Sequence, residues 1–136
     1  MSTANNDLKN KVQNQKVVKI NDKAYLINAF KGIKGWSYLP RLTKYVFPFI
    51  SFMFDEGRGE ADVMDEMVKL LSGNNAEEVI TLIQDLVADV QVDGSTIDFD
   101  FAFAQKYDAL ILLVIEVIKL NYFDSFQRLV TNLPKD

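Results

Sequence analysis

Residues 105–121 constrain the fold more than any other stretch, because they are apolar around almost a whole helical circumference. At about 3.6 residues per turn, the polar side chains fall on one narrow stripe that Leu112 interrupts. The members of this stripe are Gln105, Asp108, Glu116 and Lys119. A helix this apolar needs neighbours on nearly every side, from this chain or from another one. We predict a central helix from near Gln105 to about Asn121, with Tyr107 among its apolar side chains.

The composition favours a folded domain. The chain has 136 residues, 49% of them hydrophobic, and this length favours one domain with a proper core. Residues 1–15 are rich in Asn, Gln and Lys, so we expect a flexible N-terminal tail, followed by a single helical domain over residues 16–136. No segment reaches the ~20 apolar residues of a membrane-spanning helix, and the N-terminus does not look like a signal peptide. We expect a cytosolic protein with no membrane partner.

Two short turns predict β structure. The β-like runs Lys16–Ile20 and Ala24–Ile27 flank the spacer Asn21-Asp22-Lys23, and Asx-rich spacers of this length favour a hairpin. Asp93-Gly94 predicts a second turn, which would form a small hairpin within residues 92–97.

The region after the first hairpin predicts a helix that is interrupted by proline. Ser37 is placed to cap this helix, with Pro40 in its first turn, where a missing N–H costs little. Pro48 lies within the following apolar pattern, so we expect a kink or break near residues 44–47. Residues 55–59 are predicted to form a loop.

The acidic middle of the chain predicts two amphipathic helices. Glu60–Leu71 has one apolar face, and Gly73 is placed to end this helix. Ala76–Val90 follows, with Asn75 as N-cap and Glu78 as the acid of a capping box. The residues predicted to face inward in this second helix are Val79, Ile80, Ile83, Leu86, Val87 and Val90.

The end of the chain predicts one more short helix, Ser125–Leu133, capped by Asp124 and closed by Pro134. The complete pattern contains little strand and no internal repeat. The predicted fold is mainly α, a small helical domain of four to six helices with a short N-terminal β-hairpin.

The residues offer little for catalysis. The chain has neither cysteine nor histidine, so it has no cysteine nucleophile, and it lacks both the commonest general base and the commonest metal ligand. Asp93, Asp98 and Asp100 gather in one segment, but the spacing of a calcium loop is absent, and we interpret them as caps and solvated turn residues. We therefore expect no enzyme activity, no metal and no cofactor.

The charges are unevenly distributed along the chain. Residues 1–54 carry nine Lys/Arg and two Asp/Glu, a balance of +7, whereas residues 55–108 carry three and fourteen, a balance of −11. This asymmetry fits an ordinary solvated surface, and it also suits head-to-tail contact between copies or docking on a charged partner. The basic half contains Tyr25, Trp36, Tyr38 and Tyr45, but its bases are spread out and the acidic half would repel phosphates, so nucleic-acid binding is not expected.

Aromatic residues crowd in two places, at Phe47–Phe54 and around Tyr122–Phe126. They can fill a core, or they can form a patch that accepts an amphipathic helix of a partner or a second copy.

The order of these features resembles the small tail assembly chaperones of tailed bacteriophages, over residues 16–130. The matching segments are KVVKINDKAYLI, KGIKGWSYLPRLTKYVFPFI and EADVMDEMVKLLSGNNAEEVITLIQDLV. The most specific part is the end of the match, carried by Asp98, Phe99, Phe103, Ala104, Tyr107, Leu110, Asn121, Tyr122 and Phe126. The sequence departs from the family pattern at Tyr122, where Phe is common, and this change keeps the aromatic ring.

The resemblance implies a function that the residues do not reveal. Such chaperones bind the long, helical tape measure protein in the host cell cytoplasm and keep it soluble until the tail tube polymerises around it. The resemblance also implies that the protein is absent from the mature virion. The tail tube protein and a frameshifted longer form of the chaperone are further partners that the resemblance suggests, and homo-oligomers remain open.

Leu112, Tyr122 and Phe126 are our candidates for the protein-binding surface, because the core needs them least. Three alternatives remain open at this stage: a structural tail or baseplate component of the virion, a small phage nucleic-acid-binding regulator, and a helical adaptor with another client.

Overall fold

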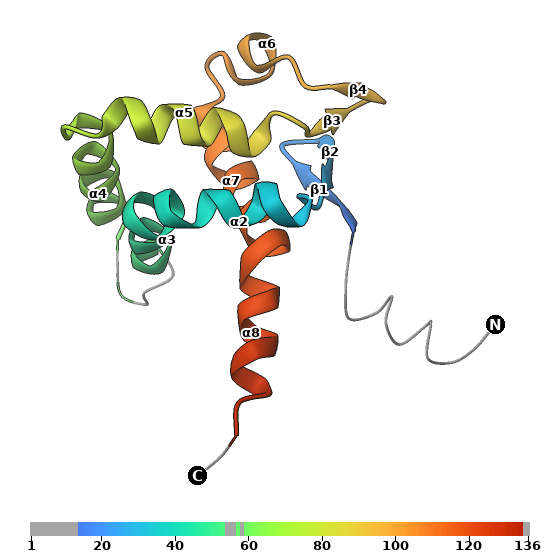
Figure 1. Ribbon diagram of the computed structural model, residues 1–136. Coiled ribbons are helices and arrows are strands. Elements are labelled where there is room, and N and C mark those ends of the chain that lie inside the picture. The colour runs from blue at the N-terminus through green and yellow to red at the C-terminus, as the bar shows by residue number, and fades with distance from the viewer. Residues whose placement is uncertain (1–13, 54–56, 58, 135–136) are drawn as a thin grey trace. The chain divides into compact units, whose positions relative to one another are not determined.

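The structure is a computed structural model, and it describes residues 14–53, 57 and 59–134. The chain divides into two compact units (Figure 1). Unit 1 comprises Met1–Phe30 and Val87–Asp136, and unit 2 comprises Lys31–Leu86. The predicted tail lies outside the described residues up to residue 13, and the single-domain assignment stays a prediction.

The fold is mainly α, as predicted, with five continuous helical segments in the described part of the chain. Two of these segments contain a π-helical turn, in which the backbone widens locally. The helices are α2 (Gly32–Arg41), η1 (Leu42–Val46), α3 (Phe47–Met53), α4 (Glu60–Ser72), α5 (Ala76–Val87), α6 (Phe99–Phe103), α7 (Tyr107–Ile118), η2 (Lys119–Phe123) and α8 (Asp124–Thr131).

The predicted N-terminal hairpin is confirmed. Strands β1 (Gln15–Ile20) and β2 (Lys23–Asn28) pair antiparallel. Asn21 and Asp22 both have positive φ, 49° and 69°, which is the backbone of a two-residue type I′ turn, and Asn and Asp tolerate this conformation better than other non-glycine residues.

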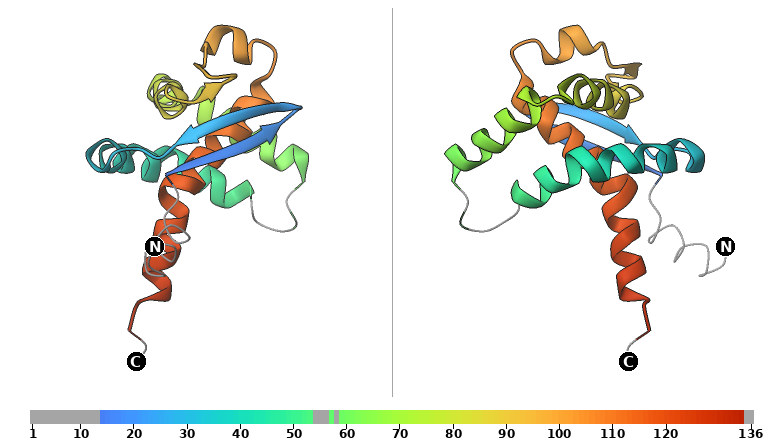
Figure 2. Two further views of the ribbon diagram at one scale, coloured as in Figure 1. Left: turned by 90° about the vertical axis from the view of Figure 1, so that its right-hand side faces the viewer. Right: turned by 60° about the vertical axis from the view of Figure 1, so that its left-hand side comes forward.

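A second hairpin extends the sheet in unit 1. Strands β3 (Gln91–Val92) and β4 (Ser95–Thr96) give the sheet order β1-β2-β3-β4 (Figure 2). Asp93 and Gly94 have φ values of 54° and 81°, so the predicted turn is present and its geometry again matches type I′.

α7 forms the core of unit 1, as expected of the central helix, and it lies against β1. Its buried residues are Ala109, Leu110, Leu113, Val114, Ile115, Val117 and Ile118. The helix begins at Tyr107 and not at Gln105, because Gln105 has a φ of 59° and cannot continue a right-handed helix. Tyr107, which was grouped with the apolar side chains of this helix, is 66% exposed at its first position.

α8 continues directly from α7 through η2, which corrects the prediction that Asp124 caps a separate helix. Asp124 has helical angles, φ −62° and ψ −41°, and its backbone N–H donates to the Lys119 carbonyl five residues earlier. The Asn121 side chain donates to the Val117 carbonyl at 2.9 Å. This side-chain bond satisfies a carbonyl at the point where the backbone pattern changes.

Unit 2 begins with α2, whose start also differs from the prediction. The helix begins at Gly32, and Ser37 lies inside it, where its hydroxyl donates to the Lys34 carbonyl at 2.6 Å. Ser37 therefore bonds back along the helix and does not cap it. Pro40 is inside the helix as well, near its end and not in its first turn.

The irregularity predicted ahead of Pro48 is present as the π turn η1. The Phe47 backbone N–H donates to the Leu42 carbonyl. A proline ring clashes with the carbonyl four residues before it, and the wider π turn is the local change that lets the helix continue into α3.

α4 and α5 match the two predicted acidic helices, and Gly73 follows the end of α4. The Glu78 carboxylate, predicted to complete a capping box, accepts the Tyr45 hydroxyl at 2.6 Å. Ile80 is 47% exposed and Leu82 is fully buried. The predicted inward face therefore omitted Leu82 and wrongly included Ile80.

Candidate protein-binding surface

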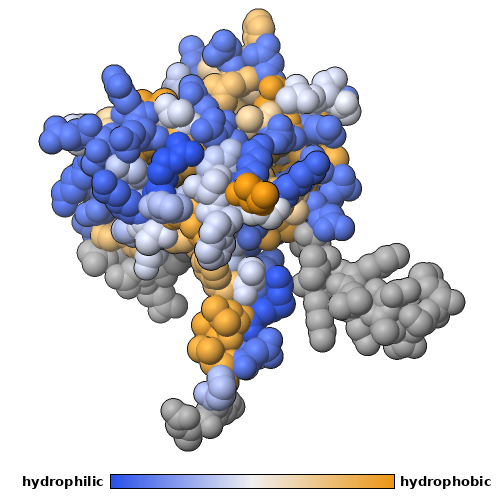
Figure 3. Space-filling view, viewed as in Figure 1, coloured by the Kyte–Doolittle hydropathy of each residue, from blue (hydrophilic) through white to orange (hydrophobic). Residues whose placement is uncertain are grey.

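The clearest exposed apolar surface among the described residues of unit 1 lies on α8. None of the described α8 residues is buried. Large apolar side chains recur at i, i+3, i+4 and i+7, with Leu133 just past the helix end, and their exposed fractions range from 39% to 68%. We call this set the α8 stripe, and it consists of Phe126, Leu129, Val130 and Leu133. Figure 3 shows apolar surface on one side of this helix and polar surface on the other.

The three residues predicted from sequence occupy different environments. Leu112 is 46% exposed and Phe126 is 39% exposed, whereas Tyr122 is buried at 4%. The Tyr122 and Phe126 rings are 6.5 Å apart, so the structure brings these two together. Leu112 is on α7, about 21 Å further along the same helical segment at ~1.5 Å rise per residue.

Tyr122 is buried in η2, immediately before the start of α8. Its ring centroid lies 6.4 Å from that of Phe30, which follows the hairpin. The neighbouring Asn121 side chain accepts the Phe30 backbone N–H at 2.7 Å. These contacts hold the junction from which the α8 stripe starts, and the Tyr122 ring lies next to that of Phe126.

Sequence reasoning missed most of the α8 stripe. Leu129, Val130 and Leu133 were assigned to a last helix, but no function was given to them. The signal was available in their helical spacing from Phe126. The spacing does not reveal that this face stays exposed among the described residues of unit 1.

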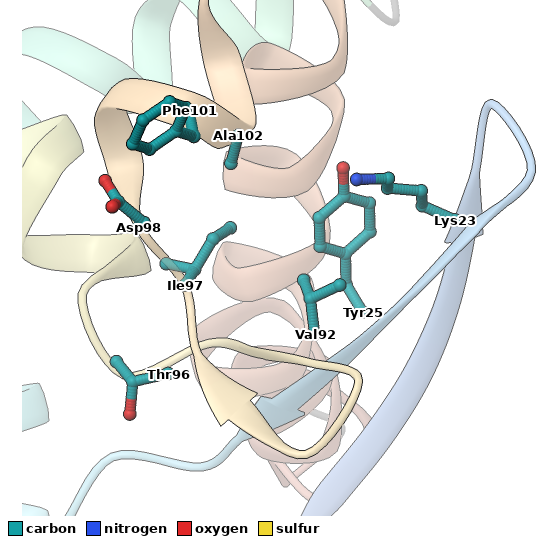
Figure 4. Close-up of a pocket in the computed structure, with 8 residues that line it drawn as sticks. All are labelled: Lys23, Tyr25, Val92, Thr96, Ile97, Asp98, Phe101 and Ala102. Atoms are coloured by element: carbon teal, nitrogen blue, oxygen red, sulfur yellow. The ribbon is translucent and has the colours of Figure 1, made fainter.

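A separate pocket of about 190 Å³ lies between the sheet and α6 in unit 1 (Figure 4). Its apolar lining comes from Tyr25, Val92, Ile97 and Ala102, with Phe101 at the rim. Phe101 is 84% exposed. The pocket is large enough for one apolar side chain of a partner.

The polar side chains of this pocket come from Lys23, Tyr25, Thr96 and Asp98. Burial raises the pKa of the Tyr25 hydroxyl above its ordinary value of 10.0, so this group stays protonated at neutral pH. In Figure 4 the Lys23 amine lies near that hydroxyl, and the Asp98 carboxylate lies on the opposite side. Asp98 caps α6 by accepting the Asp100 backbone N–H at 3.2 Å, which is the capping role expected for this acid.

The other candidate sites from the sequence are also placed by the structure. Among the described residues, no group of three or more Asp or Glu side chains is arranged to hold a metal ion. Of the aromatic residues considered for nucleic-acid binding, only Trp36 is exposed, at 74%; Tyr25, Tyr38 and Tyr45 are buried. In the aromatic cluster, Phe47 and Phe49 are half-buried, and Phe54 lies outside the described residues.

No helix in the described part of the chain combines the length and the apolar character that crossing a membrane requires.

An exposed apolar helical face such as the α8 stripe is typical of proteins that act through protein–protein contacts. Residues 21–134 match the family model of the phage tail assembly chaperone protein (TAC). The chain therefore belongs to the phage tail assembly chaperone family, as the sequence resemblance predicted. Comparisons with curated proteins and with solved structures gave no match.

Proposed function

We propose that this chain binds helical segments of the tape measure protein and keeps that protein soluble until the tail tube polymerises around it. The observation that carries the proposal is the α8 stripe, a helical face of apolar side chains that remains exposed. An amphipathic client helix, with apolar residues at the same i, i+3, i+4 and i+7 spacing, would pack its own apolar face against the α8 stripe.

The size of the stripe suits a reversible contact. Burying one large apolar side chain contributes about 1.5–3 kcal/mol at most, and the side chains of the α8 stripe are already partly covered. After the cost of association, a single stripe gives weak binding. Strong retention of a long client then depends on several copies bound along it, and the polymerising tube can displace them one at a time.

Within this proposal the three residues predicted from sequence have distinct roles. Phe126 contacts the client directly, and Tyr122 holds Phe126 in place from the core. Leu112 forms a second contact on the exposed side of α7, which a client helix running parallel to the α7–α8 axis would reach.

The proposal includes the cellular context that the family implies. The protein acts without catalysis, in the cytoplasm of the infected host cell, and it is absent from the mature virion. The tape measure protein is its client, and the tail tube protein and a frameshifted longer form of the chaperone are its further partners.

The first experiment co-expresses the chain with the tape measure protein from the same genome and measures the soluble, co-purifying client. We expect wild type to retain the client in solution and Leu129→Gln/Val130→Gln to lose most of it. Val17→Thr is the matched control, since Val17 is 67% exposed on β1 and lies outside the α8 stripe. If the client stays insoluble and unbound with wild type, the proposal is wrong.

A second measurement separates an assembly chaperone from a structural tail component. Mass spectrometry of purified virions should detect tape measure and tube proteins and not this chain. Its presence at a fixed copy number per particle would favour the structural alternative.

A further inference from the structure

The pocket between the sheet and α6 contains a buried tyrosine whose hydroxyl lacks a hydrogen-bond partner among the described residues. Tyr25 is only 2% exposed, and in Figure 4 its hydroxyl points into the pocket, toward Ala102. In the described part of the chain, every fully buried polar side-chain atom has a partner, so this oxygen is the kind that solvent or a ligand reaches through the pocket. A nearly buried polar group that opens into a cavity is well placed to bind a ligand.

A positive charge lies at the same end of the pocket. Lys23 is exposed on β2, two residues before Tyr25, and Figure 4 shows its amine near the Tyr25 hydroxyl. Lys23 forms no ion pair with any described residue. An ammonium can only donate hydrogen bonds and the protonated Tyr25 hydroxyl can also donate, so the matching group is an anionic acceptor such as a carboxylate. Asp98 lies on the opposite side and caps α6.

The rest of the pocket is apolar and has room for one side chain. Its volume is about 190 Å³, whereas an apolar cavity of about 150 Å³ is large enough to bind benzene. The apolar walls come from Val92, Ile97 and Ala102 together with the Tyr25 ring. A ring or a branched aliphatic group therefore fits, and it would also cover part of the exposed Phe101 side chain at the rim.

An unpaired strand edge borders the pocket at Thr96. β4 is the last strand of the sheet, and its two-residue turn makes Val92 and Ser95 the hydrogen-bonded pair. The next residue, Thr96, therefore directs its N–H and C=O away from β3, and the Ile97 N–H again donates inward, to the Val90 carbonyl at 2.9 Å. No described residue bonds these two groups of Thr96. An extended backbone can pair with them.

We propose that this pocket binds the free carboxyl end of a polypeptide chain whose last residue is apolar. The last side chain fills the pocket, the terminal carboxylate accepts hydrogen bonds from Lys23 and Tyr25, and the preceding backbone pairs with Thr96. A chain end supplies an anion, an apolar group and an extended backbone together, whereas a small aromatic acid lacks the backbone. The inference does not rest on the proposed function, because the pocket contains none of the residues of the α8 stripe.

Fluorescence anisotropy with the full chain tests this specificity. The probe is the peptide Gly-Ser-Gly-Ser-Phe with fluorescein at its N-terminus and a free carboxyl end. We expect this peptide to bind, and we expect its C-terminal amide to bind about tenfold more weakly, because the charged acceptor is lost. A peptide ending in Gly should lose at least as much, because the apolar contact is missing. 3-Phenylpropionate, which has the ring and the carboxylate without the backbone, should compete only weakly.

Matched pairs of variants locate the binding in the pocket. Ala102→Leu fills the pocket with a good helix former and should abolish binding, whereas Ala104→Leu, at the exposed end of α6, should leave it unchanged. Lys23→Met should weaken binding of the free-acid peptide about threefold and leave the amide unaffected. Lys19→Met, on the exposed side of β1, is its control. Tyr25→Phe, which keeps the ring, should also discriminate less between acid and amide.

Amide NMR with saturating peptide gives the local readout. The Thr96 amide should shift and become protected from hydrogen exchange, because it gains a backbone acceptor, while the Leu129 amide on α8 should not change. Far-UV circular dichroism checks that each variant folds, and Lys23→Met, at an exposed position, keeps the test valid if Ala102→Leu does not. Absence of peptide binding, or equal binding of the acid and the amide, would overturn the proposal. Competition by 3-phenylpropionate as strong as that by the peptide would assign the pocket to a small aromatic acid and would also overturn it.

Discussion

α7 and α8 are parts of one continuous helical segment, yet they use their apolar side chains in opposite ways. α7 buries apolar residues around most of its circumference, whereas none of the described α8 residues is buried. The apolar face of α7 contributes to folding, because it removes that surface from water within unit 1. The apolar face of α8 contributes little to folding and remains available to a partner. Hydrophobicity alone therefore does not tell which part of a helix belongs to the core.

The largest expected effect comes from comparing the same Leu→Ala substitution in α7 and in α8. Leu113 is fully buried on α7 and Leu129 is 59% exposed on α8. Leu113→Ala should lower the free energy of unfolding by about 3–5 kcal/mol, and Leu129→Ala should change it by less than about 0.5 kcal/mol. Urea denaturation followed by circular dichroism measures both. Equal losses would mean that α8 is packed in solution, and the contrast between the two parts would fail.

The junction between the two parts should show an intermediate effect. Asn121→Ala removes the acceptor of the Phe30 backbone N–H and the donor to the Val117 carbonyl. Leaving such groups unpaired costs about 1–3 kcal/mol. Hydrogen exchange should become faster at the Phe30 amide, while Asn132→Ala, at the end of α8, should leave it unchanged. Unaltered protection at Phe30 would contradict this role.

A smaller effect is expected for the ion pair between α7 and the N-terminal hairpin. Lys16 Nζ lies 3.0 Å from Glu116 Oε2, and both side chains are partly exposed. Glu116→Gln should cost less than about 1 kcal/mol. The difference from wild type should shrink as salt is raised, because screening weakens partly exposed ion pairs. A loss that is independent of salt would point to packing of the Glu116 side chain and not to its charge.

The smallest effect concerns the pH dependence of stability that Tyr25, on strand β2, contributes. Tyr25 is neutral when protonated, and burial raises its pKa in the folded state above the ordinary 10.0. The folded state therefore holds this proton more tightly than the unfolded state does, and the corresponding stability is lost as pH rises above about 10. Tyr25→Phe should flatten this part of the pH profile, and titration at 295 nm should show one tyrosine ionising late. An identical alkaline profile in the variant would exclude Tyr25 as the cause.

Local sequence signals predicted the parts of this fold that depend on local chemistry. Asn21-Asp22 and Asp93-Gly94 both suit the positive φ of type I′ turns, so both hairpins could be predicted. The helical period predicted α7 in the same way. Gly73 correctly marked the end of α4.

The errors arose where contacts distant in sequence decide the outcome. Asp124 and Ser37 look like N-caps, but each lies inside a continuous helix, and a cap signal cannot tell whether the preceding turn is already helical. Tyr122 is buried because Phe30, far away in the sequence, packs on it. Leu129 and Val130 are exposed because no described element of unit 1 covers them, and a local sequence pattern cannot predict which elements will cover a helix face.

The π turn η2 also sets the direction in which the α8 stripe faces relative to α7. Compared with an α-helical turn, a π turn accommodates roughly one additional residue, and each residue of an α-helix advances the rotation by about 100°. If residues 119–123 became α-helical with none of them removed, every later side chain would point about 100° away from its present direction, whereas deleting one of them would restore a uniform α-helix and keep the present direction. The π turn therefore determines which side of the helical segment presents the α8 stripe, although none of the residues of the stripe belongs to it.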